Sequence, residues 1–371
     1  MQIQSIQRYL RSIKSLRNDT MAVLTVNDES LLAQLRQALA DDGRLSFEDV
    51  QRLIWSTFDY GAVTRKEYDD LFRILRDSQT MDGRSREYLR NFLNSVRAVL
   101  PNGSARVDVT EVARQHVNEF EARGGRGVFA HLDRATVANY LKLHVLCPAM
   151  LNQGQTYLCG PTSFMYSLAS DNPYLYVRVG ILLFETGRCQ LGRINISPSS
   201  DLLTYKIPGA ARIDQAHWMI AASLRDSENW FFSLDSYDSW VAKTNPREVE
   251  RWFRNVGYSQ IHCNYTTLEG NIPEHTRKRI EEANRYYNAG YRVVLYLNSN
   301  MMSKDAEKRA TSSSIADHFV AMSSQIQSSN ESVSMKVFSW GKKYFQIPVA
   351  GSTLSFNDFS SNFYGSIAAK Y

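Results

Sequence analysis

The chain has 371 residues, a formal net charge of +5 and four cysteines. A mildly basic charge spread over this length, without a long basic run, argues against a nucleic-acid-binding protein. The cysteines are spaced too widely for a zinc motif and are too few for a disulfide framework, which indicates folding in a reducing compartment. We expect neither a cofactor nor a metal.

The N-terminal residues lack the apolar segment and the cleavage site of a secretory signal peptide. No stretch is long and apolar enough for a membrane span, so we expect no transmembrane segment and a cytoplasmic location in the producing cell. Residues 3–16 place apolar side chains at helical spacing with Arg and Lys between them, which predicts an amphipathic helix. Two interpretations stay open: a membrane-surface or delivery element, or a helix docked on the body of the protein.

The length favours two domains, and the next hundred residues predict short helices separated by turns. Thr64 with Glu67 is a capping box, and Ser46 with Asp49 is a weaker version of it. The glycine-containing turns superficially resemble calcium-binding loops but lack the necessary oxygen ligands. Because the helical pattern continues to a Cys-Pro break, we place an all-helical N-terminal domain at residues 1–145 and a second domain at residues 146–371.

Residues 152–163 read Asn-Gln-Gly-Gln-Thr-Tyr-Leu-Cys-Gly-Pro-Thr-Ser. This pattern predicts a loop that turns directly into a helix, with Cys159 at or just before the first helical turn. Unpaired N–H groups and the positive end of the helix dipole stabilise an anion there, so the pKa of such a cysteine is lowered. We interpret Cys159 as a nucleophile; the alternative is a small buried hydrophobic residue.

Several helices are predicted after the cysteine, and β-strands follow them. The β-branched and aromatic residues at 291–297 and 318–322 predict strands. Residues 333–340 and 343–347 predict a hairpin that turns at Gly341-Lys342. Helices followed by an antiparallel sheet define an α+β fold.

A thiolate nucleophile needs a base, and His318 is the best placed of the seven histidines. It begins an apolar strand directly after a polar loop, with Asp317 before it. The other six lie in predicted helices or in an edge strand. A base at the mouth of a sheet, facing a nucleophile at a helix tip, recurs in cysteine hydrolases. The alternative is a structural histidine.

Three short motifs resemble the papain-like cysteine peptidase superfamily, most closely the bacterial branch that includes bacteriocin-leader peptidases. They are Gln-x5-Cys-Gly-Pro-Thr-Ser, Asp-His-Phe-Val and Ser-Trp-Gly, within residues 150–365. The resemblance implies a papain-like domain whose nucleophile helix packs on a C-terminal antiparallel sheet. It also implies Cys159 as nucleophile and His318 as base. Gln153, at 159 − 153 = 6 residues before the cysteine, would help to form the oxyanion hole, with Gln155 as substitute.

The third catalytic position departs from the pattern of that family. The family commonly has Asn or Asp in a segment ending Asn-Ser-Trp-Gly or Asp-Pro-Trp-Gly, and here Phe338 occupies that position. Ser339 or a residue from elsewhere could orient the imidazole, or the site could work as a Cys-His dyad. A pseudoenzyme is a further alternative. Trp340 either shields the imidazole or belongs to the core.

These residues together predict a thiol hydrolase that cleaves a peptide or isopeptide bond. The alternatives are a glutamine deamidase or acyltransferase of the same fold, and a catalytically inactive papain-like binding module. By analogy, the helical domain and the missing signal peptide suggest a bacterial effector or toxin, secreted into a target cell by a route independent of signal peptides. Its expected partners are a protein or peptide substrate and an inhibitory immunity protein.

Overall fold

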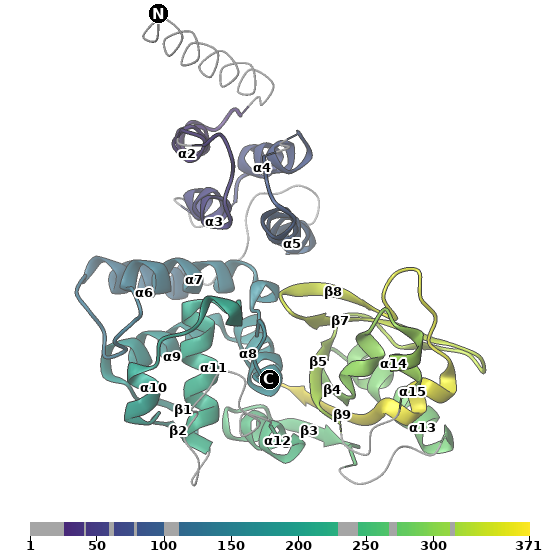
Figure 1. Cartoon of the computed structure of the whole chain (residues 1–371). Coiled ribbons are helices and arrows are strands. Elements are labelled where there is room, and N and C mark those ends of the chain that lie inside the picture. The colour runs from purple at the N-terminus through teal and green to yellow at the C-terminus, as the bar shows by residue number, and fades with distance from the viewer. Residues whose placement is uncertain are drawn as a thin grey trace, which may run out of the picture. The chain divides into compact units, whose positions relative to one another are not determined.

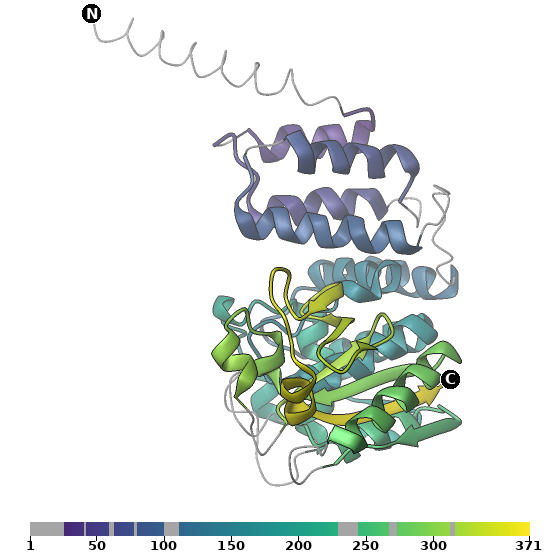
Figure 2. The ribbon, with the colours of Figure 1, turned by 90° about the vertical axis from the view of Figure 1, so that its right-hand side faces the viewer.

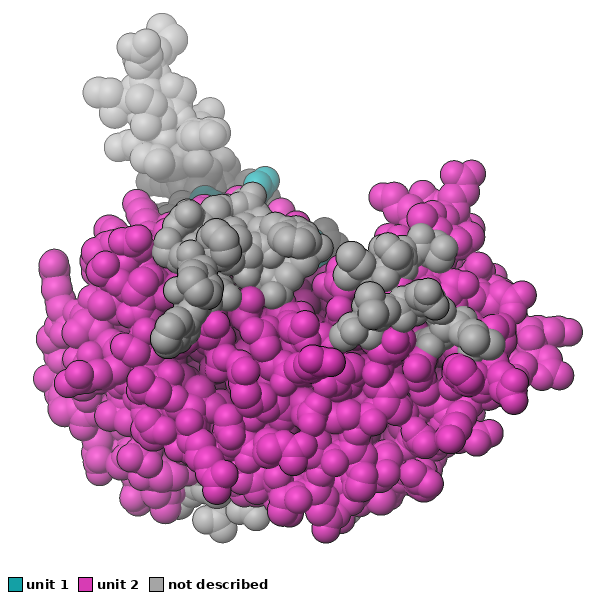
Figure 3. All heavy atoms as spheres, turned by 90° about the horizontal axis from the view of Figure 1, so that it is seen from below, with its two compact units in different colours: residues 1–109 teal, residues 110–371 magenta. Residues whose placement is uncertain are grey.

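The computed structural model describes residues 26–40, 42–58, 63–77, 80–99, 111–228, 244–266, 273–311 and 316–371 (Figure 1). It divides into two compact units, residues 1–109 and 110–371, which are coloured separately in Figure 3. The amphipathic helix predicted at residues 3–16 and most of the polar loop before His318 lie outside the described residues. None of the helices in the described part has the length and apolar character needed to cross a membrane.

The first unit is helical in its described residues. Its elements are α2 (Glu29–Ala38), α3 (Phe47–Trp55), η1 (Ser56–Phe58), α4 (Arg65–Asp77) and α5 (Gly83–Val99). The predicted capping boxes are confirmed. Thr64 N–H donates to Glu67 Oε2 (2.6 Å) and Glu67 N–H to Thr64 Oγ1 (3.2 Å), while Ser46 and Asp49 cap α3 in the same way.

The second unit begins with helices that the sequence assigned to the first domain. Helix α6 (Glu111–Ala122) and helix α7 (Arg134–Leu146) contact α9 (Pro173–Thr186), and α7 also contacts α11 (Gln215–Glu228). Phe120 of α6 packs edge-to-face on Phe184 of α9, with ring centroids 5.2 Å apart. Residues 111–145 therefore share a core with the second unit, and the predicted boundary at residue 145 differs from the observed division at Val109.

Smaller elements complete the helical part of this unit. They are η3 (Pro148–Met150), α10 (Ser200–Thr204), η4 (Gly209–Ala211), α12 (Pro246–Asn255) and the two-stranded hairpin of β1 (Cys189–Leu191) and β2 (Ile194–Ile196).

A seven-stranded antiparallel sheet forms the other side of the second unit. Its order is β3-β9-β4-β5-β7-β6, with β8 also paired to β7. The strands are β3 (Gln260–Cys263), β4 (Arg292–Leu297), β5 (His318–Met322), β6 (Gln327–Ser328), β7 (Val333–Ser339), β8 (Lys342–Ile347) and β9 (Phe363–Lys370). The α+β prediction is confirmed, and so are the strands expected near residues 291–297, 318–322 and 333–347. Strand β9 was not expected, because Gly365 and its two alanines carry little β-propensity.

Further helices cover this sheet on the side away from α6 and α9 (Figures 1 and 2). These elements are α13 (Pro273–Asn288), η6 (Ser299–Met302), α14 (Ala306–Ala310) and α15 (Phe356–Asn362). Ile280 and Ala283 of α13 pack with Val293 and Leu295 of β4 in one buried apolar cluster.

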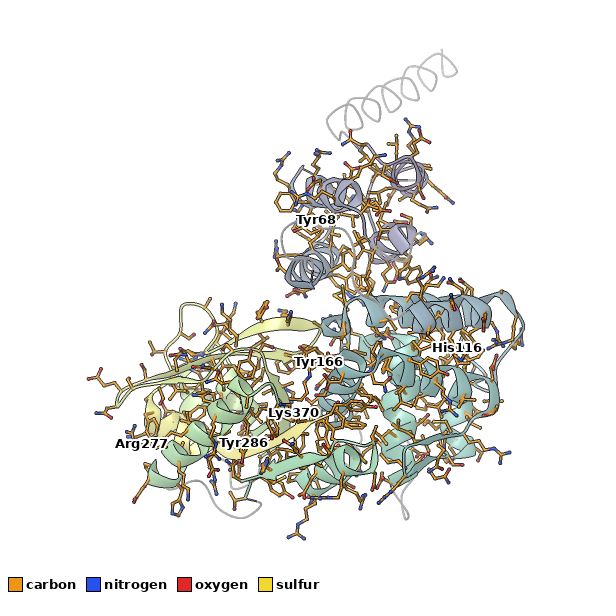
Figure 4. All side chains as sticks on the ribbon, turned by 180° about the vertical axis from the view of Figure 1, so that it is seen from behind. Tyr68, His116, Tyr166, Arg277, Tyr286 and Lys370 are labelled. Atoms are coloured by element: carbon orange, nitrogen blue, oxygen red, sulfur yellow. The ribbon has the colours of Figure 1, made fainter. Side chains whose placement is uncertain are left out.

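Helix α8 (Cys159–Asp171) joins the two halves of the unit, because it contacts α9 and α11 as well as β5. Tyr166, labelled in Figure 4 between the helices and the sheet, stacks on Phe338 of β7 with ring centroids 3.9 Å apart. At the end of α8, both Asp171 carboxylate oxygens accept hydrogen bonds from Arg292 of β4 (2.7–3.1 Å). The helix is thus fixed against the sheet along its length, with Cys159 at its start.

Candidate active site

Cys159 is the first residue of α8, as the sequence predicts. Leu158 occupies the N-cap position and supplies no side-chain hydrogen bond to the helix. The backbone N–H groups of Cys159 and Gly160 therefore remain available to the sulfur, and both lower the pKa of the thiol. This is the helix-start environment in which a thiolate is stabilised.

The sulfur contacts the backbone on both sides of His318. Cys159 Sγ donates a hydrogen bond to Asp317 O (3.8 Å), and the N–H of Phe319 is also directed to the sulfur. Strand β7 pairs with β5 only at Ala321 and Met322, so the sulfur reaches the free backbone of β5 at the first residues of that strand. Cys159 and His318, separated by 318 − 159 = 159 positions in the sequence, are thereby brought together.

His318 is held between Ser339 and Trp340. Its Nε2 lies 3.1 Å from Ser339 Oγ, and its ring stacks on the indole of Trp340 with centroids 4.9 Å apart. Within the described residues, the Cys159 thiol donates to Asp317 O and not to the imidazole. The imidazole is therefore oriented by its partners on β7 and at the hairpin, while the thiol lies against the strand.

Burial keeps both side chains neutral in the resting protein. Desolvation raises the pKa of Cys159 to about 11, against the smaller lowering by the N–H groups of Phe319 and Gly160. Desolvation also lowers the pKa of His318 to about 4, although the Asp317 carboxylate acts in the opposite direction. The expected lowering of the cysteine pKa is thus outweighed by burial, and the pair is thiol and neutral imidazole at pH 7.

Gln153 belongs to a loop that is held by hydrogen bonds between Gln153 and Thr156. Its Nε2 donates to Thr156 O (3.3 Å), and Thr156 Oγ1 donates to Gln153 O (2.6 Å). The Gln153 side chain is buried next to the start of α8, whereas Gln155, the substitute considered from the sequence, is exposed. The amide of Gln153 is thus directed to its own loop, and among the described residues no hydrogen bond joins it to Cys159.

Strand β7 accounts for the departure from the Asn or Asp pattern. Phe338 turns toward α8 and stacks on Tyr166, so this position serves packing. The register of β7 against β8 shifts between Val337 and Ser339, and the next residue, Ser339, meets His318 Nε2. Ser339 thus places a hydroxyl against the imidazole, on which Trp340 stacks.

The hairpin after Ser339 carries backbone strain. Trp340 (φ 47°) and Gly341 (φ 69°) both have positive φ, as in a two-residue type I′ turn. The turn lies one residue earlier than predicted. A left-handed conformation costs a residue with a side chain about 1–2 kcal/mol, and in this case it places the indole over the His318 ring.

Asp317 anchors the first residues of β5 through a partner that no sequence motif indicates. Its carboxylate accepts hydrogen bonds from Ser299 N–H (2.7 Å) and Ser299 Oγ (3.0 Å). The peptide group that meets the thiol is therefore tied to η6. Nothing in the pattern around Ser299 marks it, because the contact depends on how β4 and β5 pair.

A buried polar network holds the first turns of α8 from the helical side. Thr162 Oγ1 lies 2.7 Å from His217 Nε2, and the backbone N–H of His217 donates to Asp214 Oδ1 (2.7 Å). Asp214 Oδ2 lies 3.3 Å from His144, whose Nδ1 meets the Tyr176 hydroxyl at 2.9 Å. Burial lowers the pKa of His217 to about 3, so this histidine is neutral. The sequence indicated only that His217 lies in a helix.

Arg212, the residue directly after η4, also has a left-handed backbone and borders the Gln153 loop. Gly154 (φ 60°) contacts η4 so closely that a Cβ there would lie 2.0 Å from Ala211 O and 2.7 Å from Arg212 O. Gln155 N–H donates to the same Ala211 O (2.7 Å). Arg212 has φ 51° and ψ 32°. In the described part of the chain, Arg212 and Trp340 are the non-glycine residues with positive φ, and both adjoin this site. Such strain clusters at functional sites.

No family model, curated protein or solved structure matches this chain. Within the described ranges, no group of three or more His, Cys, Asp or Glu side chains is placed to hold a metal ion. The chemistry of the site therefore has to be judged from the geometry of its own residues.

Proposed function

We propose that the second unit is a papain-like cysteine hydrolase that cleaves a peptide or isopeptide bond. The observation that carries this proposal is the contact of the Cys159 sulfur with the backbone on both sides of His318. A thiol at an uncapped helix start, next to a histidine oriented by a hydroxyl, is the arrangement that nucleophilic catalysis by cysteine requires.

The architecture supports the same proposal. Helix α8 lies against an antiparallel sheet, and the base stands at the first residue of β5. This is the arrangement expected of a papain-like domain from the sequence motifs. Ser339 takes the orienting role that Asn or Asp fills in that family, since its hydroxyl lies against His318 Nε2.

The first half of the reaction forms a thioester. As the sulfur attacks the carbonyl carbon, its proton passes to His318 and the carbonyl electron pair moves to oxygen. The oxyanion is held by the N–H of Cys159 and the amide of Gln153, a contact worth about 3–4 kcal/mol of barrier. The tetrahedral intermediate collapses, the C–N bond breaks, and His318 gives its proton to the leaving amine.

The second half releases the acyl group. Water attacks the thioester carbon while His318 takes a proton from it, and the sulfur leaves and recovers that proton. Because the resting pair is neutral, the proton transfer accompanies substrate attack rather than preceding it. The thiol must also leave Asp317 O to reach the substrate.

Alkylation by iodoacetamide tests the nucleophile with internal controls. Burial raises the pKa of three thiols: Cys159 to about 11, Cys189 to about 12, and Cys147 higher still. Partial burial and the Glu250 carboxylate raise the pKa of Cys263 to about 12. We expect mass spectrometry of the full chain at pH 8 to show Cys159 labelled first, although Cys263 is the exposed cysteine. The His318→Ala variant should slow labelling at Cys159 about tenfold and leave Cys263 unchanged. Faster labelling at Cys263, or no effect of His318→Ala, would refute the assignment.

A mixture of peptides then identifies the reaction. New peptide termini indicate hydrolysis, conversion of glutamine to glutamate indicates deamidation, and neither indicates a binding module. The Cys159→Ala variant, with its fold verified by circular dichroism, should produce no new termini. Delivery as an effector or toxin, and an inhibitory partner, remain predictions by analogy, from the helical N-terminal domain, the papain-like motifs and the missing signal peptide.

A further inference from the structure

We propose that Arg212 determines specificity: its guanidinium binds a carboxylate that the substrate carries close to the scissile bond. The inference rests on the proposed function of Cys159 and names the class of substrate, a polypeptide with an acidic residue at this position. It is carried by the place of Arg212 beside the Gln153 loop, by its exposed guanidinium and by the charges around it.

Arg212 is joined to the loop that leads into Cys159. The carbonyl carbon and oxygen of Arg212 would each lie 2.7 Å from a Cβ at Gly154, so the two backbones are in direct contact. Gln155 N–H donates to the carbonyl of Ala211, the residue before Arg212 (2.7 Å). The arginine therefore starts next to the buried Gln153, and its long side chain can reach a substrate held at that loop.

The backbone of Arg212 has a conformation that glycine would adopt without strain. Its φ of 51° and ψ of 32° lie in the left-handed region, where an L-residue with a Cβ is disfavoured. The residue is exposed, and in the described ranges its guanidinium has neither a hydrogen-bond nor an ion-pair partner. The left-handed backbone ends η4, where the backbone N–H of Arg212 donates to Gly209 O (3.3 Å). The conformation therefore serves the turn, and the exposed guanidinium is free to bind an external group.

The charges around the loop favour an anionic group. Residues 148–163 and 205–213, the two segments that meet here, contain no Asp or Glu and two cations, Lys206 and Arg212. The uncapped start of α8 adds the positive end of a helix dipole. Two acids near these segments are hydrogen-bonded within the protein: Asp214 faces His144 and His217, and Asp317, whose charge raises the pKa of Cys159, is bound by Ser299. Guanidinium and carboxylate match in charge and in planar geometry.

Two electrophiles of similar size but different charge separate the effect of the potential around Cys159 from the reactivity of its thiol. Iodoacetamide is neutral and iodoacetate is an anion, so the ratio of their alkylation rates at Cys159 reports the local potential. We expect Arg212→Gly, which keeps the left-handed turn, to lower the iodoacetate-to-iodoacetamide ratio about threefold at low ionic strength, with a smaller effect in 1 M salt. The conservative Arg212→Lys variant should retain most of the ratio.

The controls distinguish this inference from the proposed function. Arg193→Ala removes an exposed cation at the β1–β2 turn, whose backbone contacts Asn255 at the far end of α12, and should leave the ratio at Cys159 unchanged. Cys263 in the same samples should show no change in Arg212→Gly. An unaltered ratio at a Cys159 that still depends on His318 would overturn the role of Arg212 alone. An unreactive Cys159 would overturn the hydrolase itself.

Discussion

Trp340 links backbone strain to the chemistry of one imidazole. Its indole covers the His318 ring, and burial holds the pKa of that histidine at about 4. In Trp340→Gly the left-handed turn is kept and the cover is lost, so we expect the pKa of His318 to rise toward 6.5. An NMR titration of the His318 ring proton measures this, with the His262 resonance as reference. An unchanged pKa would show that the indole does not control solvation of the base.

The positions of Cys159 at a helix start and of His318 at a strand start could be predicted from the sequence, and their partners could not. Cys159 was marked by a Gly-Pro that starts a helix, and His318 by a polar loop before an apolar strand. Ser339 was one of several alternatives, because its hydroxyl becomes an imidazole partner only through the pairing of β7 with β5. Arg212 carried no signal, since a left-handed φ at an arginine cannot be read from a local pattern.

At the scale of elements, α8 depends on the hydrogen bond between Thr162 and His217. In Thr162→Val the shape of the side chain is kept, but His217 Nε2 loses its partner in a buried site. We expect a loss of about 1–3 kcal/mol in the free energy of unfolding. Thr162→Ser keeps the hydroxyl and should be more stable than Thr162→Val, although it removes a buried methyl group. Urea unfolding compares the two, and a valine variant as stable as the serine variant would contradict the role of this bond.

Helices, and strands rich in β-branched and aromatic residues, could be predicted because their sequence patterns are strong. Strands composed of small residues could not. β4, β5 and β7 contain branched and aromatic residues, whereas β9 reads Phe-Tyr-Gly-Ser-Ile-Ala-Ala-Lys. Its small residues fit a strand that is covered on both faces, which only the assembled sheet reveals. The helices α6 and α7 were recognised, but not that they pack with α9 and α11, because packing partners leave no local pattern.

At the scale of the whole molecule, two buried neutral histidines make stability depend on pH. The pKa of His217 is about 3 and that of His318 about 4 in the folded protein, below the ordinary value of 6.5. The unfolded chain therefore binds more protons below pH 6.5, and the free energy of unfolding falls as the pH drops from 6.5 toward 4. Each histidine contributes a loss of up to about 2 kcal/mol between pH 7 and pH 5.

Urea unfolding at pH 7 and pH 5, followed by tryptophan fluorescence, measures this dependence. His217→Gln should remove part of it, while His275→Gln, at an exposed position of α13, should leave it intact. Equal pH dependence in the two variants would show that His217 is not held neutral by its surroundings.

The central place of β9 has a consequence for the synthesis of the protein. Strand β4, which aligns β5 and with it His318, pairs on its other side with residues 363–370. Chains emerge from the ribosome N-terminal end first, so Cys159 and its helix are made long before these eight residues. Until then β4 is an unprotected sheet edge. The sheet that contains the strand beginning at His318 is therefore completed only after residues 363–370 have been synthesised.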